Sequence, residues 1–86
     1  MNIPRIKYVE PQEGHILAVT FTNGERKKYD AARLLKQEMF APLMNQAFFR
    51  NVAVEPGGYA VSWNSKLDVS EYELWRYGED MLPDVI

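Results

Sequence analysis

A hairpin turn at Asn23-Gly24 constrains the fold of this chain more than any other short feature. Asn-Gly between two alternating stretches is the strongest short-range sequence signal for a β-hairpin. In the stretch 16–21, Leu17, Val19 and Phe21 share one face at period two. A two-residue loop would place Tyr29 on the opposite face, whereas a three-residue loop pairs Leu17 with Tyr29 and keeps Tyr29 on the apolar face. We therefore predict the longer turn, with Gly24 in the left-handed bulge position.

A second turn is predicted at Gly57-Gly58, after the strand 50–55. Whether a loop has an even or an odd number of residues (its parity) decides which face each side chain of the second strand occupies. Here parity favours the shorter loop. A two-residue loop pairs Val54 with Val61 and Val52 with Trp63, so that all four apolar side chains share one face. A three-residue loop would put the valines on the opposite face. We therefore predict a two-residue turn, with two glycines to supply the positive φ that it needs.

The first predicted helix follows Asp30, whose carboxylate can accept from the free N–H groups of a first helical turn. Apolar residues then recur at i, i+3, i+4 and i+8, which is the spacing of a helix with one buried face. The helix is expected to stop near Phe40, because Pro42 disfavours helical geometry in the residue before it. The residues of the predicted stripe are Ala31, Leu34, Leu35 and Met39.

The second predicted helix begins after Ser70. Glu73 stands three residues later, which completes the pattern of a capping box, and Val69 with Leu74 fits the accompanying hydrophobic staple. Gly78 stands where a helix of this length would end. We therefore predict a short capped helix that carries Trp75.

Together these elements indicate an α+β fold. A further strand, 6–10, is predicted with Ile6 and Tyr8 on one face. The prediction is a small antiparallel sheet of about five strands in two hairpins, in the order β-β-β-α-β-β-α, with two short helices packed on it. Residues 1–78 are expected to form a single domain and residues 79–86 a C-terminal tail.

Composition excludes several classes of protein. The chain has 86 residues, of which 47% are hydrophobic, enough for one small packed core. It has no cysteine, so disulfides and cysteine-based metal sites are excluded. There is no signal-peptide pattern and no apolar run long enough to cross a membrane, so we expect a cytoplasmic protein. A net charge of -2 with interspersed signs argues against nucleic acid or a membrane as the partner.

The sequence offers no recognisable catalytic, metal or cofactor site. His15 is the only histidine, and no serine stands in a nucleophile-elbow motif. Asp68, Glu71 and Glu73 are close in sequence, but the two glutamates lie about 200° apart on a helix that turns about 100° per residue. Acidic residues at that place ordinarily complement the helix dipole. We therefore expect no enzyme activity, no cofactor and no metal.

Binding residues are easier to nominate than catalytic ones. Five aromatic residues could form a stacking platform, although core packing is the ordinary role for Trp63 and Trp75, and those that stay exposed would mark an interface. They are Tyr59, Trp63, Tyr72, Trp75 and Tyr77. The basic strand Arg26–Lys28 would ordinarily be a solvated or edge-protecting strand. The tail keeps apolar residues after Gly78. The candidate partner contacts are Trp75, Tyr72, Tyr77, Met81, Leu82 and Ile86.

The order of these features resembles the bacterial domain-of-unknown-function family 2442. The resemblance covers about residues 5–76 and rests on the Asn23-Gly24 hairpin, Tyr29-Asp30, Trp63, the segment 68–70 and Leu74-Trp75. It implies a small α+β domain with no established catalytic site. Relatives resemble stand-alone bacterial proteins, some joined to a helix-turn-helix domain and some encoded beside another small protein, as in toxin–antitoxin pairs. This chain has no residues left over for a helix-turn-helix module, so a role of that kind would need a partner.

Two hypotheses of function follow. The first is a non-enzymatic protein-interaction module, antitoxin-like, which contacts a protein partner or a second copy of itself through exposed aromatics and the tail. The alternative is a small-ligand or nucleic-acid binding domain that uses Trp75, Tyr72 and the Arg26–Lys28 strand. Protein capture would favour the first hypothesis. Salt-dependent oligonucleotide binding or quenching of tryptophan fluorescence by metabolites would favour the second.

Overall fold

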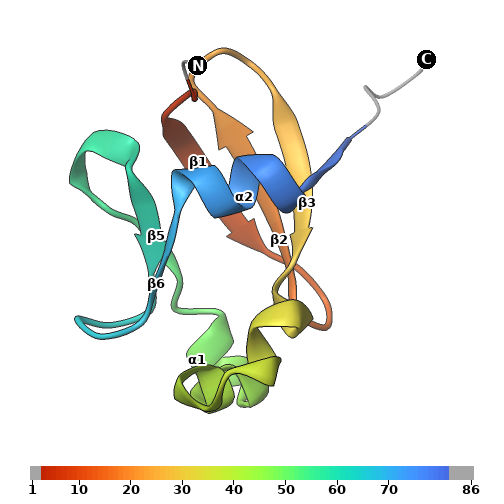
Figure 1. The fold of residues 1–86 in the computed structure, drawn as a ribbon, viewed down its shortest axis with the longest axis vertical. Coiled ribbons are helices and arrows are strands. Elements are labelled where there is room, and N and C mark those ends of the chain that lie inside the picture. The colour runs from red at the N-terminus through yellow and green to blue at the C-terminus, as the bar shows by residue number, and fades with distance from the viewer. Residues whose placement is uncertain (1–2, 82–86) are drawn as a thin grey trace.

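A computed structural model describes residues 3–81, which form a small α+β fold (Figure 1). The two antiparallel sheets lie next to each other, the helical connection that joins them in sequence lies at one end of both, and a final helix lies across the face of the larger sheet. The strands are β1 (Ile6–Pro11), β2 (Ile16–Phe21), β3 (Arg26–Asp30), β4 (Ala53–Val54), β5 (Ala60–Ser62), β6 (Asp68–Ser70) and β7 (Glu79–Asp80). The helices are η1 (Ala31–Lys36), η2 (Glu38–Met44), α1 (Gln46–Phe49), η3 (Pro56–Gly58) and α2 (Glu71–Tyr77), where η denotes a 3-10 helix.

The larger sheet has the strand order β1-β2-β3-β7 and confirms the predicted first hairpin. Leu17 pairs with Tyr29, and the Phe21 N–H donates to the Glu25 carbonyl at 2.8 Å. The turn between them is therefore the three-residue one, with Gly24 at φ +92°. This register places the Tyr29 ring in the core beside Leu17, as the parity of the sequence predicted.

The first strand contains a β-bulge that the sequence analysis missed. Ile6 pairs with Phe21, but Tyr8 pairs with Thr20, so β1 uses one more residue than β2 over this interval. The bulge separates the two side chains that we predicted to share a face. Ile6 is buried, whereas Tyr8 is 62% exposed, and that prediction is wrong. Val9, opposite Val19, packs against the core instead.

Strand β7 extends the larger sheet beyond the predicted hairpins. Lys27 pairs with Asp80 and Lys28 with Glu79, and the Met81 N–H donates to the Arg26 carbonyl at 2.9 Å. The segment that we set apart as a tail thus begins with a strand. Leu82 and Ile86 lie outside the described residues.

The helical connection after Asp30 differs in type from the predicted α-helix. The Asp30 side chain accepts from the Ala32 N–H at 2.9 Å, as predicted for an N-cap. A 3-10 helix has three residues per turn, so its buried positions recur every third residue. Met39 departs from this repeat and is 57% exposed, which makes the predicted helical stripe wrong at that position. The buried residues are Ala31, Leu34, Phe40 and Leu43.

The smaller sheet has the order β4-β5-β6, and its first hairpin keeps the predicted register. Val54 pairs with Val61. The loop is longer than predicted, because the Glu55 N–H donates to the Ala60 carbonyl and leaves four residues, 56–59, between them. Four residues give the same parity as two, so the error in loop length did not change the faces.

Two further features of this region differ from the prediction. The predicted strand 50–55 is confined to β4, because Phe49 ends a short helix and Arg50 and Asn51 lie in a turn. Strand β6, which was not among the predicted strands, pairs with β5 through Val61 and Val69. The side chain of Asn64 accepts from the backbone N–H of Lys66 and Leu67 and thereby closes the turn that returns the chain.

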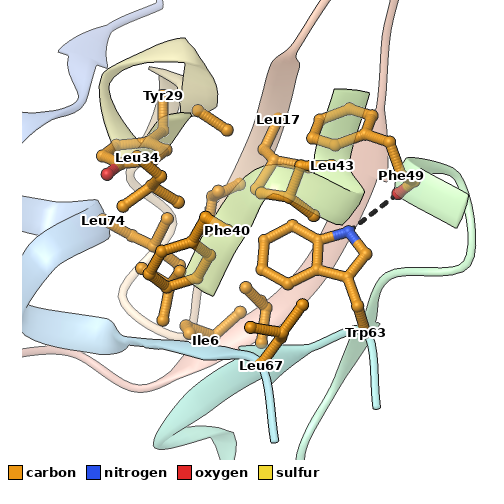
Figure 2. Close-up of a cluster of buried hydrophobic side chains, with 14 of the residues drawn as sticks. Ile6, Leu17, Tyr29, Leu34, Phe40, Leu43, Phe49, Trp63, Leu67 and Leu74 are labelled. Carbon is orange, nitrogen blue, oxygen red and sulfur yellow. Dashed lines mark hydrogen bonds between the residues drawn. The ribbon is translucent and has the colours of Figure 1, made fainter. Parts of the chain in front are cut away.

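The core lies where the two sheets, the helical connection and α2 meet (Figure 2). The Trp63 indole N–H donates to the Phe49 carbonyl at 2.9 Å, which joins the residue after β5 to the end of α1. His15 Nε2 donates to the Leu43 carbonyl at 2.9 Å, and its ring meets the Phe49 ring edge to face. The helical connection is thus held from both sides by side-chain to backbone hydrogen bonds.

Candidate functional site

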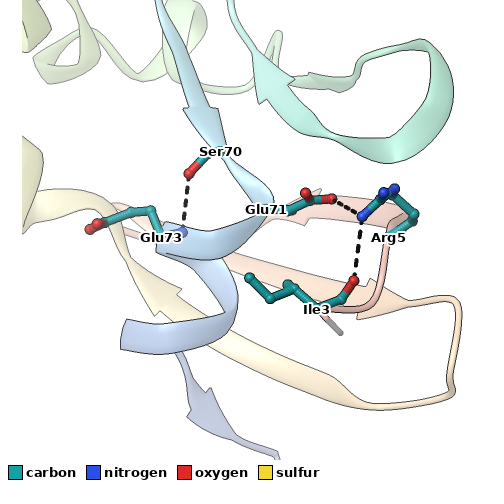
Figure 3. Close-up of polar contacts among 5 residues, drawn as sticks. All are labelled: Ile3, Arg5, Ser70, Glu71 and Glu73. Atoms are coloured by element: carbon teal, nitrogen blue, oxygen red, sulfur yellow. Dashed lines mark hydrogen bonds and ion pairs between the residues drawn. The ribbon is translucent and has the colours of Figure 1, made fainter. Parts of the chain in front are cut away.

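The candidate site is built on α2, which follows β6 directly and is fixed at its first turn (Figure 3). The Ser70 hydroxyl accepts from the Glu73 N–H at 3.2 Å, as predicted for the N-cap. Arg5 donates to the Glu71 carboxylate at 3.1 Å and so joins α2 to the segment before β1. Leu74 is the fully buried residue of the helix. The opposite face of α2 is therefore presented to solvent.

The Glu73 side chain does not complete the predicted capping box. Its Oε2 accepts from the Tyr29 hydroxyl at 2.7 Å and from the Arg33 Nε at 3.0 Å. Two strong donors from distant elements thus replace the backbone N–H of Ser70 as its partners. Burial, and next the hydrogen bond to Glu73, raise the pKa of Tyr29 far above its ordinary value. The phenol therefore stays protonated and acts as a donor.

Tyr77 and two arginines form a cluster at the end of α2. The Arg33 guanidinium lies 4.0 Å from the centre of the Tyr77 ring, and the Arg76 guanidinium lies 5.2 Å from it. Arg33 is also the partner of Glu73. We call Arg33, Arg76 and Tyr77 the aromatic–arginine cluster. Its ring and both guanidinium groups are held by stacking while remaining partly accessible, since Tyr77 is 45% exposed.

Trp75 lies on the other flank of the helix. The ring is half-buried and packs against the core, and the Lys27 ammonium lies 5.2 Å from the ring centre. Lys27 also pairs with Asp80 at 3.3 Å, and its side chain is only 12% exposed. The Trp75 indole N–H is buried without a hydrogen-bond partner in residues 3–81. Arg26 and Lys28 point to the outer side of β3, so the basic strand does not present one surface.

The aromatic residues nominated from sequence are not gathered into one patch. Trp75 and Tyr77 lie about 160° apart on a helix that turns about 100° per residue. Tyr72 is 48% exposed on the outer face between them. Met81 is half-buried beside Arg26, and Leu82 and Ile86 are outside the described residues. The structure therefore brings Tyr77 together with arginines rather than with the other aromatics.

A groove of about 420 Å³ opens beside the aromatic–arginine cluster, between η1 and strand β6. We call it the β6 groove. Its volume falls in the range of small-molecule and peptide-binding clefts. Arg33 and Glu73 belong to both the groove and the network described above, so groove and cluster are continuous. The lining residues are Arg33, Leu34, Lys36, Gln37, Phe40, Asp68, Val69, Ser70 and Glu73.

Sequence reasoning missed the two arginines and the groove. Arg76 is adjacent to Tyr77, so its proximity was readable from the sequence. Arg33 reaches α2 only because η1 folds back beside it, and its pairing with Glu73 spans forty positions of the chain. No local pattern signals a contact of that kind. The groove depends likewise on β6, which was not predicted.

Within residues 3–81, no group of three histidine, aspartate or glutamate side chains is placed to hold a metal ion. In the same part of the chain, no helix has the length and apolar character needed to cross a membrane.

Comparison with known proteins gives one match. A family model described as "Protein of unknown function (DUF2442)" matches residues 6–80. No curated protein and no solved structure matches the chain.

Proposed function

The chain belongs to the family described as Protein of unknown function (DUF2442), and we propose that it is a non-enzymatic protein-interaction module. Its contact surface is the aromatic–arginine cluster together with the adjoining β6 groove. The observation that carries this proposal is the stacking of the exposed Tyr77 ring against Arg33 and Arg76, beside a groove of about 420 Å³.

The composition of this surface supports binding to protein. Tyrosine and arginine are among the residues that contribute most to binding energy at protein interfaces. Arg33 is held by Glu73 at 3.0 Å and by the Tyr77 ring. Side chains held in this way lose less conformational freedom on binding, so more of their contact energy appears as affinity.

The non-enzymatic part of the proposal is supported by the engagement of His15. Its Nε2 donates to the Leu43 carbonyl and its ring packs on Phe49. A histidine used in this way fixes the helical connection, which gives the only histidine of the chain a structural role. The acidic residues at the start of α2 are likewise engaged, Glu71 by Arg5 and Glu73 by Arg33.

The proposed partner is a small protein encoded beside this one, as in a toxin–antitoxin pair. This part rests on the resemblance of the chain to bacterial relatives with such neighbours. A compact module of this kind would act by covering a functional surface of that partner. The groove and the cluster provide one continuous area for such a contact.

The test is co-purification of the tagged chain from its host, followed by titration calorimetry with the recovered protein. Tyr77→Ala removes the ring on which both arginines stack, and we expect at least a tenfold loss of affinity, about 1.4 kcal/mol. Tyr8→Ala is the matched control, because Tyr8 is an exposed tyrosine on β1. It should bind as the wild type does.

Two outcomes would contradict the proposal. Repeated recovery of the monomer alone, confirmed by light scattering, would leave no protein partner to bind. Equal affinity of the Tyr77→Ala and Tyr8→Ala variants would place the contact elsewhere. Salt-dependent binding of an oligonucleotide without any protein partner would favour the nucleic-acid alternative. A dimer weakened by Tyr77→Ala would support the proposed contact surface but contradict the proposal of a separately encoded partner, because the partner would then be a second copy.

A further inference from the structure

Strand β6 is the edge of the smaller sheet. The residues of β6 that bond to β5 alternate with residues whose backbone N–H and C=O groups face outward. The Trp63 N–H donates to the Leu67 carbonyl at 2.9 Å, and the Glu71 N–H donates to the Tyr59 carbonyl at 2.8 Å. Hydrogen-bonded pairs alternate along an antiparallel ladder, so Val69 exchanges hydrogen bonds with β5. The backbone groups of Asp68 and Ser70 therefore point away from β5, toward the open edge.

The groove lies along this open edge. Asp68, Val69 and Ser70 form one of its walls. Within residues 3–81, the N–H groups of Asp68 and Ser70 have no partner outside the ladder. Ser70 is informative because Glu73, which would accept from its N–H in a capping box, is turned toward Tyr29 and Arg33. The edge therefore offers at least two backbone donors and the Asp68 carbonyl.

The opposite wall supplies a cation and the exposed edges of two largely buried apolar side chains. Leu34 and Phe40 stand on η1 and η2 as lining residues, and Lys36 stands between them in sequence. Lys36 has no ion-pair partner among the described residues, whereas Arg33 is already paired with Glu73. A ligand carboxylate is thus favoured near Lys36. Asp68 on the facing wall disfavours a second acidic group there.

From this combination we propose that the β6 groove binds an extended peptide segment of the partner, which adds a strand to the edge of β6. The segment carries one acidic side chain toward Lys36 and small apolar side chains toward Phe40. Strand addition satisfies backbone groups that face the open edge, and the pockets for alternate side chains provide selectivity. This inference rests on the proposed function and names the part of the partner that enters the groove.

A flexible segment suits the site better than a folded edge. The groove is bounded by η1 on one side and β6 on the other. A second copy would have to bring its own β6 with the same wall attached. An extended segment can enter between the walls without that obstruction. We therefore do not propose that β6 pairs with β6 of a second copy, and the experiment distinguishes that outcome from peptide binding.

The experiment uses a panel of acetylated pentapeptide amides of alternating valine and threonine. Each peptide carries glutamate, glutamine or lysine at one position. We measure binding by calorimetry and amide hydrogen exchange by NMR in the free and peptide-saturated protein. The affinity of the best glutamate peptide should be at least ten times that of the peptide with lysine at the same position. Lys36→Glu should reverse that order, and N-methylation of the peptide backbone should abolish binding.

Amide exchange provides an internal control. The Asp68 and Ser70 amides should exchange rapidly in the free protein and become protected in the complex. The Val69 amide, already bonded to β5, should be protected in both states. If no peptide protects Asp68 and Ser70, or if glutamate and lysine peptides bind equally, the inference is wrong. A protein partner that binds through Tyr77 but leaves these two amides unprotected would overturn the inference and leave the proposed function intact. Protection that depends on protein concentration without peptide would also overturn it, since this would indicate self-pairing of β6.

Discussion

The hydrogen bond from Tyr29 to Glu73 can be tested by a substitution that removes one oxygen atom. Tyr29 is fully buried, and its hydroxyl donates to the Glu73 carboxylate at 2.7 Å. Tyr29→Phe keeps the ring packing and deletes only the donor. The matched control is Tyr8→Phe, which makes the same chemical change at an exposed residue of β1.

The expected loss of stability follows from the partners that Glu73 retains. A hydrogen bond to a charged group contributes about 1.5–3 kcal/mol to stability. Glu73 keeps Arg33, and its side chain is 26% exposed, so water can replace part of what is lost. We therefore expect Tyr29→Phe to lower the free energy of unfolding by about 1.5 kcal/mol, the lower end of that range. The total free energy of unfolding for a chain of this length is about 4–13 kcal/mol. Tyr8→Phe should change stability by less than about 0.5 kcal/mol.

The same substitution predicts a pH dependence. Burial and the bond to Glu73 hold the pKa of Tyr29 far above its ordinary value in the folded protein. In the unfolded chain it ionises near pH 10. Above that pH the unfolded wild type has lost this proton and the folded wild type has not, so wild-type stability falls by about 1.4 kcal/mol per pH unit. The phenylalanine variant lacks this loss. By pH 11 the two proteins should be nearly equal in stability.

The assay is urea denaturation followed by tryptophan fluorescence, at several pH values from 7 to 11. Titration of the other tyrosines and of the lysines is common to both proteins and cancels in the difference. A gap between wild type and Tyr29→Phe that stays constant to pH 11 would show that Tyr29 ionises normally in the folded state. A gap at pH 7 no larger than that of Tyr8→Phe would show that the bond to Glu73 does not stabilise the fold.

Two further predictions concern the smaller sheet. Gly58→Ala should lower the melting temperature by more than Gly24→Ala does, as measured by thermal denaturation. Both glycines have positive φ, but an added Cβ would lie 2.5 Å from the Ile6 carbonyl oxygen at Gly58, whereas it would have nothing within 4 Å at Gly24. Equal melting temperatures would show that the packing of η3 on β1 is loose. Trp63→Phe should lower the free energy of unfolding, measured by urea denaturation, by about 1–3 kcal/mol, because it leaves the buried Phe49 carbonyl without its 2.9 Å donor. A loss below about 1 kcal/mol would show that this carbonyl finds another partner.

Parity made the sheet registers predictable. In both hairpins the apolar face had to be continuous, and only some loop lengths satisfy that condition. Tyr29 opposite Leu17 and Val61 opposite Val54 were therefore readable from the sequence and are confirmed. Loop length itself was not readable for the second turn, because two and four residues give the same faces.

Features set by long-range packing were not predictable in this way. The bulge that turns Tyr8 outward arises from the pairing of β1 with β2, and the sequence of β1 alone does not show it. The residues after Asp30 fit an α-helical stripe nearly as well as a 3-10 repeat until Met39, where the two periods diverge. Local spacing cannot decide between them. Contact of the chain with the core decides, since Phe40 and Leu43 are the residues that become buried.

Glu73 shows how such a failure of a local rule can mark a site. Ser70 and Glu73 have the spacing of a capping box, and the serine half of it forms. The glutamate had two alternative uses, one backbone N–H nearby or a phenol and a guanidinium from elements distant in sequence. The capping box offers one neutral donor, whereas Tyr29 and Arg33 offer two donors, one of which carries a positive charge, so the distant partners are favoured. The exchange has two consequences. It fixes Arg33 beneath the Tyr77 ring, and it leaves the Ser70 N–H at the open edge of β6. The departure from the sequence rule thus joins the aromatic–arginine cluster to the groove, which is where a departure is expected if this surface carries the function.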